Sequence, residues 1–159
     1  MLTLNYLKSI LFPKDQPDME GVDDKDQVLE ARSGLEGAVE LLQSKELPVA
    51  VVLEHAEQHQ LMLRNEGGFH ECTQSVWIME MKAFDEDGAE VSERCYQRFK
   101  RLYQIFIHRY TEGDAQLTRW IERSEMNAYA REAGSYIGYE IFINFREDED
   151  LSYAPRTTA

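Results

Sequence analysis

Two histidines near the middle of the chain have a spacing that can bind a metal ion. His55 and His59 lie four residues apart, which on a helix turns both imidazoles toward the same side. The pair directly follows an apolar, strand-like segment at 49–53, where a helical spacing has no meaning. We therefore expect a solvated loop here rather than a metal site.

The segment His70-Glu71-Cys72 has residue types found in zinc deaminases, but not in their order. The deaminase signature needs a glutamate two residues after the histidine and a Pro-Cys-x-x-Cys sequence further on. Here Glu71 follows His70 directly, Cys72 takes the place of that glutamate, and no second motif follows. The segment therefore does not indicate a deaminase site.

Other catalytic and ligand-binding motifs are also absent, or their residues do not have the required spacing. The acidic segment 85–88 has its glycine at position four, whereas an EF-hand calcium loop has it at position six, so we expect a solvated turn. The chain has no GxSxG sequence and no glycine-rich loop that could hold a phosphate. Cys95 falls on the apolar stripe of a predicted helix and is best explained as a core residue. We therefore predict no catalytic, cofactor-binding or metal-ligating residue.

Three arginines form the one basic feature of an acidic chain. Arg94, Arg98 and Arg101 recur at helical spacing, so they share one side of a predicted helix. One interpretation is pairing within the chain, with carboxylates such as Glu90 and Glu93. The other is a contact with an acidic neighbour such as an identical subunit, because charge asymmetry can orient subunits head to tail.

The composition favours a folded domain that does not bind nucleic acid through phosphate contacts, although a local basic patch stays compatible with it. The chain has 159 residues, 43% of them hydrophobic, which suits one compact domain with a real core. The formal net charge of -13 opposes binding to duplex DNA or anionic lipid through phosphate contacts, and otherwise serves solubility. The two cysteines form no CxxC pair, so we expect free thiols in a cytoplasmic protein or a virion component.

The N-terminal region predicts a short helix followed by a linker. Leu4, Leu7 and Leu11 have helical spacing, and the apolar stretch is too short to span a membrane. The following residues, to position 26, are polar and acidic with prolines, which is typical of a loop. We thus expect an N-terminal arm and linker at 1–26, a single α+β domain at 27–150 and a flexible tail at 151–159.

The strongest structural signal is the segment 136–146, where apolar residues alternate without a break. This period of two predicts a β-strand with one apolar face, formed by Ile137, Tyr139, Ile141, Ile143 and Phe145. Its other face carries Tyr136 and Phe142 among polar neighbours, and these two are candidate subunit contacts if exposed.

Apolar residues that recur three and four positions apart predict two helices. One lies at 27–44, with Asp26 as its N-cap, and a longer one lies at 91–110. A third, shorter helix is expected around 117–121. Further strands are expected in the following ranges: 49–53, 61–63, 69–84 and 126–131. This order predicts an α+β fold with a mostly antiparallel sheet and helices packed on one face.

The element order resembles that of the small tail-terminator and tail-completion proteins of tailed phages and prophages. The local resemblance lies in 136–145, followed by Asp150-Leu151-Ser152-Tyr153. It implies a non-enzymatic protein that forms a ring at the end of a tail tube and has no cofactor. It also implies that the acidic surface lines a lumen through which DNA passes without adhering.

Two other functions remain open. One is a small-ligand-binding or enzyme domain, in which Trp77, Tyr139 and Phe142 line a pocket between sheet and helix. The same aromatic residues serve equally well as core. The other is an acidic binding or inhibitor protein that occupies a basic surface of its partner.

Overall fold

The computed structural model describes residues 1–32, 34–55, 59–64, 67–114, 130–133 and 136–156. Within them the α-helices are α1 (Leu4–Leu11), α2 (Gly34–Lys45) and α3 (Gly88–Thr111), with short 3-10 helices at Pro13–Asp15 and Lys25–Gln27. The strands are β1 (Val28–Ala31), β2 (Val49–Glu54), β3 (His59–Arg64), β4 (Gly67–Met81), β5 (Ala130–Ala133) and β6 (Tyr136–Glu149).

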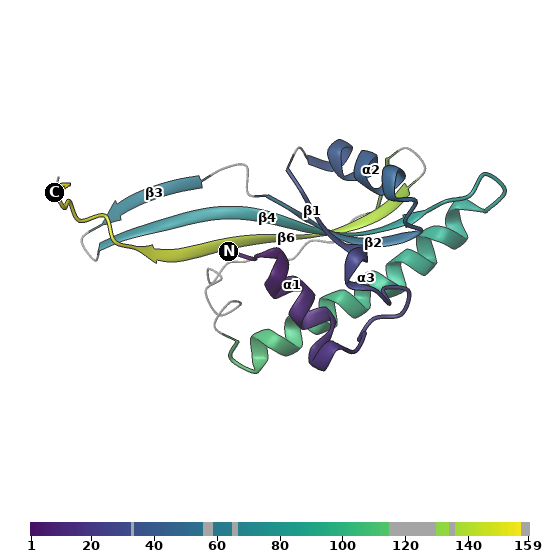
Figure 1. Ribbon diagram of the computed structural model, residues 1–159, viewed down its shortest axis with the longest axis horizontal. Coiled ribbons are helices and arrows are strands. Elements are labelled where there is room, and N and C mark those ends of the chain that lie inside the picture. The colour runs from purple at the N-terminus through teal and green to yellow at the C-terminus, as the bar shows by residue number, and fades with distance from the viewer. Residues whose placement is uncertain (33, 56–58, 65–66, 115–129, 134–135, 157–159) are drawn as a thin grey trace.

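The described strands form a single mixed sheet in the order β1-β2-β4-β6-β5 (Figure 1). The pair β1 and β2 is parallel and every other pair is antiparallel. The long strands β4 and β6 pair along nearly their whole length, from Gly68 opposite Glu149 to Met81 opposite Tyr136. The α+β class with a mostly antiparallel sheet is therefore confirmed.

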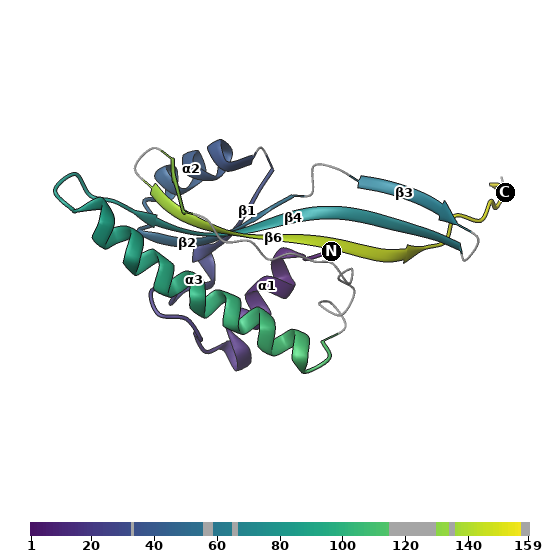
Figure 2. The ribbon, with the colours of Figure 1, turned by 180° about the vertical axis from the view of Figure 1, so that it is seen from behind.

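Helices cover both faces of the sheet, and not one face as the sequence predicted. The first cluster of core residues joins α1 and α3 to Val51, Ile78 and Ile141. The second joins α2 to Val52 and Trp77, which point the opposite way because side chains alternate along a strand. Figure 2 shows α3 and α1 on one side of the sheet and α2 on the other. The cause is the parallel β1–β2 pair, whose connection must cross over one face and carries α2 there.

The helix predicted at 27–44 is wrong in its first part. Residues Val28–Ala31 form strand β1, and the helix begins at Gly34. The predicted N-cap is also wrong, since Asp24 caps the short 3-10 helix before β1. Because this four-residue strand is mostly buried, its apolar and polar residues do not alternate. Its apolar positions therefore looked like the start of the helical stripe that follows.

The other predicted elements are confirmed where the structure describes them. These are the N-terminal helix, the strands at 49–53, 61–63 and 69–84, the long helix and the last strand. The last strand continues to Glu149, beyond the segment 136–146 from which it was predicted. The short helix expected at 117–121 lies outside the described residues, as does most of the strand expected at 126–131. No helix among the described residues is both long and apolar enough to cross a bilayer.

The first 26 residues pack on the domain. Leu7 and Leu11 of α1 are fully buried, and Met19 and Val22 of the following segment belong to the same core cluster. Thr3 caps α1 by accepting a hydrogen bond from the backbone N–H of Tyr6.

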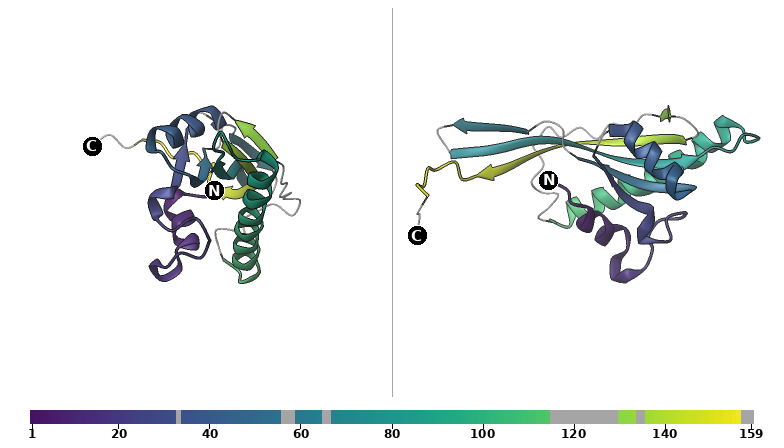
Figure 3. Two further views of the ribbon diagram at one scale, coloured as in Figure 1. Left: turned by 90° about the vertical axis from the view of Figure 1, so that its right-hand side faces the viewer. Right: turned by 45° about the horizontal axis from the view of Figure 1, so that its top comes forward.

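At one end, the sheet extends beyond the helices as three strands. We call this extension the finger, and it comprises β3, Gly67–Cys72 of β4 and Phe145–Glu149 of β6. Figure 3 shows the finger projecting from the helix-covered part of the molecule, with the C-terminal segment at its tip. The long, continuous pairing of β4 with β6 makes this extension possible.

Candidate functional site

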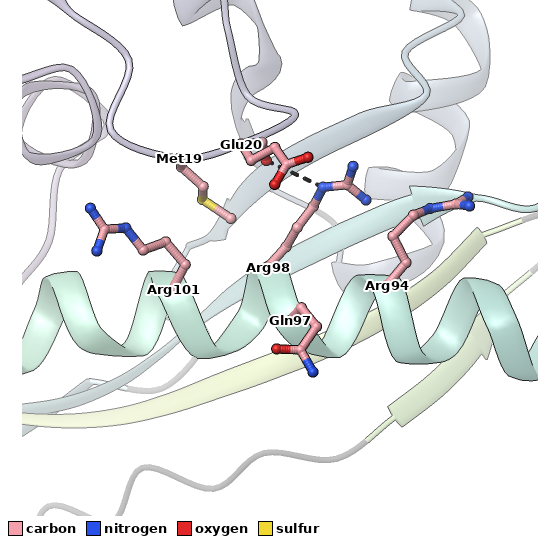
Figure 4. Close-up of a pocket in the computed structure, with 6 residues that line it drawn as sticks. All are labelled: Met19, Glu20, Arg94, Gln97, Arg98 and Arg101. Carbon is pink, nitrogen blue, oxygen red and sulfur yellow. Dashed lines mark hydrogen bonds between the residues drawn. The ribbon is translucent and has the colours of Figure 1, made fainter.

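The three arginines of α3 face the N-terminal segment across an open hollow of about 520 Å³. Figure 4 shows Arg94, Arg98 and Arg101 side by side along α3, with Met19 and Glu20 opposite them. Their spacing along the helix produces this row, as the sequence predicted.

A buried carboxylate binds two of the three arginines. Glu80 of β4 is only 3% exposed and accepts hydrogen bonds from Arg94 Nε and Arg98 Nη1. Arg94 also donates to Glu86 at 3.1 Å. The hydrogen bond with Glu80 is the main reason why the pKa of Arg94 is raised. Two guanidinium groups thus compensate a carboxylate that would be costly to bury alone.

The other contacts of the row tie the N-terminal segment to α3. Arg98 Nε donates to the carbonyl oxygen of Glu20 at 3.2 Å, and Arg101 donates to the backbone and side chain of Asp18 at 3.0 and 2.6 Å. All three arginines therefore pair within the chain, as one of the two interpretations expected. Their partners are Glu80, Glu86 and Asp18, and not the suggested Glu90 and Glu93. A further contact with a subunit stays a prediction.

The two candidate contact residues of β6 have different surroundings. Tyr136 is 1% exposed, packs in the cluster under α2 and donates its hydroxyl to the carbonyl oxygen of Leu47 at 2.9 Å. It is a core residue. Phe142 lies on the same strand face but is 36% exposed, so it remains a candidate contact.

The aromatic residues proposed to line a pocket do not converge. Trp77 belongs to the core on the α2 side, whereas Tyr139 packs against Tyr96 and Phe99 of α3 on the other side. Phe142 is partly exposed on the sheet. These positions do not support a pocket formed by the three rings between sheet and helix.

Both cysteines are free and buried, as expected from their separation. The thiol of Cys95 donates to the carbonyl oxygens of Ile78 and Ile137, and burial raises its pKa to about 12. A thiol with such a pKa is not a nucleophile at neutral pH. Cys95 is therefore a core residue, as predicted.

The finger carries two strongly exposed apolar side chains. Leu61 and Leu63 of β3 are 63% and 77% exposed. Among the described strands β3 pairs only with β4, so its outer edge is open. Open, apolar strand edges can pair with another chain.

The finger also brings together residues that the sequence analysis treated separately. His59 pairs directly with Cys72 across the β3–β4 hairpin, and His70 lies two residues from Cys72 on the same face. The possible ligand atoms of the three side chains all lie within 4.8 Å of one another. The sequence did contain the signal: two strand-like segments close together in the chain predict an antiparallel pair, and the register of that pair places His59 opposite Cys72. The spacing in sequence groups His59 with His55 instead, but His55 contacts Glu30.

No known family model matches the chain, and no curated protein matches its sequence.

Proposed function

We propose that the protein is a non-enzymatic structural protein that forms ring-shaped assemblies of identical subunits through its finger. The observation that carries the proposal is the pair of open strand edges on this extension. This assembly agrees with what the resemblance to tail-terminator and tail-completion proteins implies.

The two open edges of the finger differ, and this favours a head-to-tail contact. One edge is β3. The other is β6, whose pairing with β5 runs only from Tyr136 to Tyr139. Among the described residues no strand covers β6 beyond that point. If β3 of one subunit pairs with β6 of the next, each subunit uses both edges, and such contacts close into rings when the rotation permits.

The charges of the two strand edges and the exposed leucines of β3 agree with this pairing. The sequence of β3, HQLMLR, contains no carboxylate and one arginine. The distal part of β6 contains Glu147, Asp148 and Glu149. Opposite charge at the two edges lowers the repulsion expected between copies of an acidic protein. The exposed Leu61 and Leu63 would become covered in the contact.

The mass in solution, measured by analytical ultracentrifugation over a range of concentrations, tests the proposal. We expect a discrete oligomer that dissociates when Leu61 and Leu63 are both replaced by lysine. Two charged side chains would then lie in the contact, and lysine is the residue that natural edge strands use to prevent pairing.

The matched control is Phe84→Lys. Phe84 is a fully exposed apolar residue in the turn between β4 and α3. Figure 1 shows this turn at the opposite end of the molecule from β3. We expect this variant to keep the oligomer. A monomer at the highest soluble concentration, or dissociation by Phe84→Lys as well, would overturn the proposal.

A further inference from the structure

The cluster of His59, His70 and Cys72 on the finger has no role in the assembly proposed above. Nδ1 of His59 and Nε2 of His70 are 2.7 Å apart, and the two ring planes differ by only 8°. Cys72 is 5% exposed and His70 is 9% exposed, whereas His59 is exposed. The cluster is thus closed on the side of the core and open to solvent at His59.

Two imidazoles and one thiol are the donor set of zinc sites. Zinc binds histidine nitrogen and cysteine thiolate, and three protein ligands leave a fourth position for water or a carboxylate. Magnesium and calcium prefer oxygen ligands, so this set disfavours both. We propose that His59, His70 and Cys72 bind one zinc ion, which fastens β3 to β4.

The geometry needs only a small adjustment to accept the ion. With zinc–nitrogen bonds of about 2.0–2.1 Å, two nitrogens of a tetrahedral site lie about 3.3 Å apart. The two rings therefore have to separate by about half an ångström, because the ion takes the place of the proton that they share. The thiol proton of Cys72 leaves to solvent, since the thiolate is the ligand form. His59 is on an edge strand, which can accommodate this movement.

The outer surroundings of His70 also suit a ligand. While its Nε2 faces His59, its Nδ1 lies 3.9 Å from a carboxylate oxygen of Glu149. Histidine ligands commonly direct their second nitrogen toward a carboxylate, which fixes the ring and raises its basicity. Glu147 is opposite His70 in the β4–β6 register and shares this face of the finger. The carboxylate of Glu147 pairs with the amino group of Met1, so Glu149 is the carboxylate that the structure places beside His70.

Zinc binding to the untagged full-length protein, stripped of metal by a chelator, tests the proposal. Titration against a chromophoric competitor should give one zinc per chain. Cobalt should bind in its place and give a thiolate-to-metal charge-transfer band. Magnesium and calcium should not displace either metal. Zinc should also slow amide hydrogen exchange in β3, because the ion joins that strand to β4.

The chain supplies its own matched controls. His59→Gln, His70→Gln and Cys72→Ser should each weaken zinc binding at least about tenfold, the lower end of the effect of outer-shell partners. His55→Gln and His108→Gln remove exposed histidines outside the cluster and should bind zinc as the wild type does. Glu149→Gln should weaken binding by about tenfold if its carboxylate orients His70.

Two results would overturn the proposal. One is a zinc content far below one per chain. The other is equal zinc affinity in the wild type and in the folded cluster variants. If Cys72→Ser does not fold, the cobalt spectrum of the wild type decides, since a bound ion without a thiolate band excludes Cys72 as a ligand. Neither result depends on whether the protein forms rings.

Discussion

Glu80 of β4 and Arg98 of α3 form an ion pair in which both side chains are largely removed from water. The side chains are 3% and 15% exposed, and Arg94 adds a second guanidinium to the same carboxylate. The pair joins the longest helix to the longest strand. The row of arginines therefore has a structural role within the chain.

Replacing Glu80 by alanine should destabilise the protein by about 3–5 kcal/mol, because it leaves two guanidinium groups without their buried partner. Urea-induced unfolding measures the change in the free energy of unfolding. The matched control is Asp18→Ala, which removes the carboxylate of the well-exposed pair with Arg101. Exposed ion pairs contribute about 0–1 kcal/mol to the free energy of unfolding, so the loss in this control should be small. Equal losses in the two variants would contradict a special role for Glu80.

Two glycines should respond in opposite ways to alanine. A Cβ atom at Gly138 of β6 would overlap Met79 Sδ and lie 3.2 Å from the carbonyl oxygen of Ile78. Gly138→Ala should therefore cost about 1–3 kcal/mol by overpacking. At Gly88, the first residue of α3, a Cβ atom would lie 3.5 Å from Lys82 Cε, which is ordinary van der Waals contact. Gly88→Ala should stabilise the protein by about 0.5–1 kcal/mol. Thermal unfolding of both variants checks the contrast, and a gain in stability at Gly138 would refute it.

The sequence predicted the type of an element correctly where one face of that element is buried and the other is exposed. Strand β6 and helix α3 each have a long stripe with a clear period, so their type followed from the spacing of apolar residues. Strand β1 has no such contrast, because both of its faces are covered, and it was taken for the start of a helix. That error also hid the crossover that carries α2 to the second face.

The sites were harder to predict because they depend on register and on partners distant in sequence. The arginine row was evident from helical spacing, but its main partner, Glu80, is on a strand that precedes the helix. His59 and His70 were each assessed against their neighbours in sequence. Only the pairing of β3 with β4 brings them together, and local motifs do not contain that information.

The thiol of Cys95 should make the free energy of unfolding depend on pH in the alkaline range. In the unfolded chain the thiol loses its proton near pH 9.0, whereas in the folded protein its pKa is about 12. Between these values the unfolded state binds fewer protons, so the free energy of unfolding falls as pH rises. The slope from this group approaches about 1.4 kcal/mol per pH unit.

Comparison with Cys95→Val isolates this contribution, because the buried tyrosines titrate equally in both proteins. The difference in free energy of unfolding between wild type and variant should be constant below pH 9.0 and shift against the wild type above it. Urea titrations at several pH values give that difference. A constant difference at all pH values would mean that Cys95 titrates normally.

Helix α1 should behave as part of the core, although the sequence suggested an arm separate from the domain. Leu11 is fully buried against residues of the sheet and α3, so Leu11→Ala should cost about 2–5 kcal/mol in free energy of unfolding. Leu4 is on the same helix but only partly buried, and Leu4→Ala makes the same change of helix propensity at a smaller cost. Urea unfolding that follows the whole domain distinguishes the two arrangements. If α1 were an independent arm, Leu11→Ala would leave the unfolding of the domain unchanged. A single transition that shifts with Leu11→Ala, and much less with Leu4→Ala, would place the first helix within the folding unit.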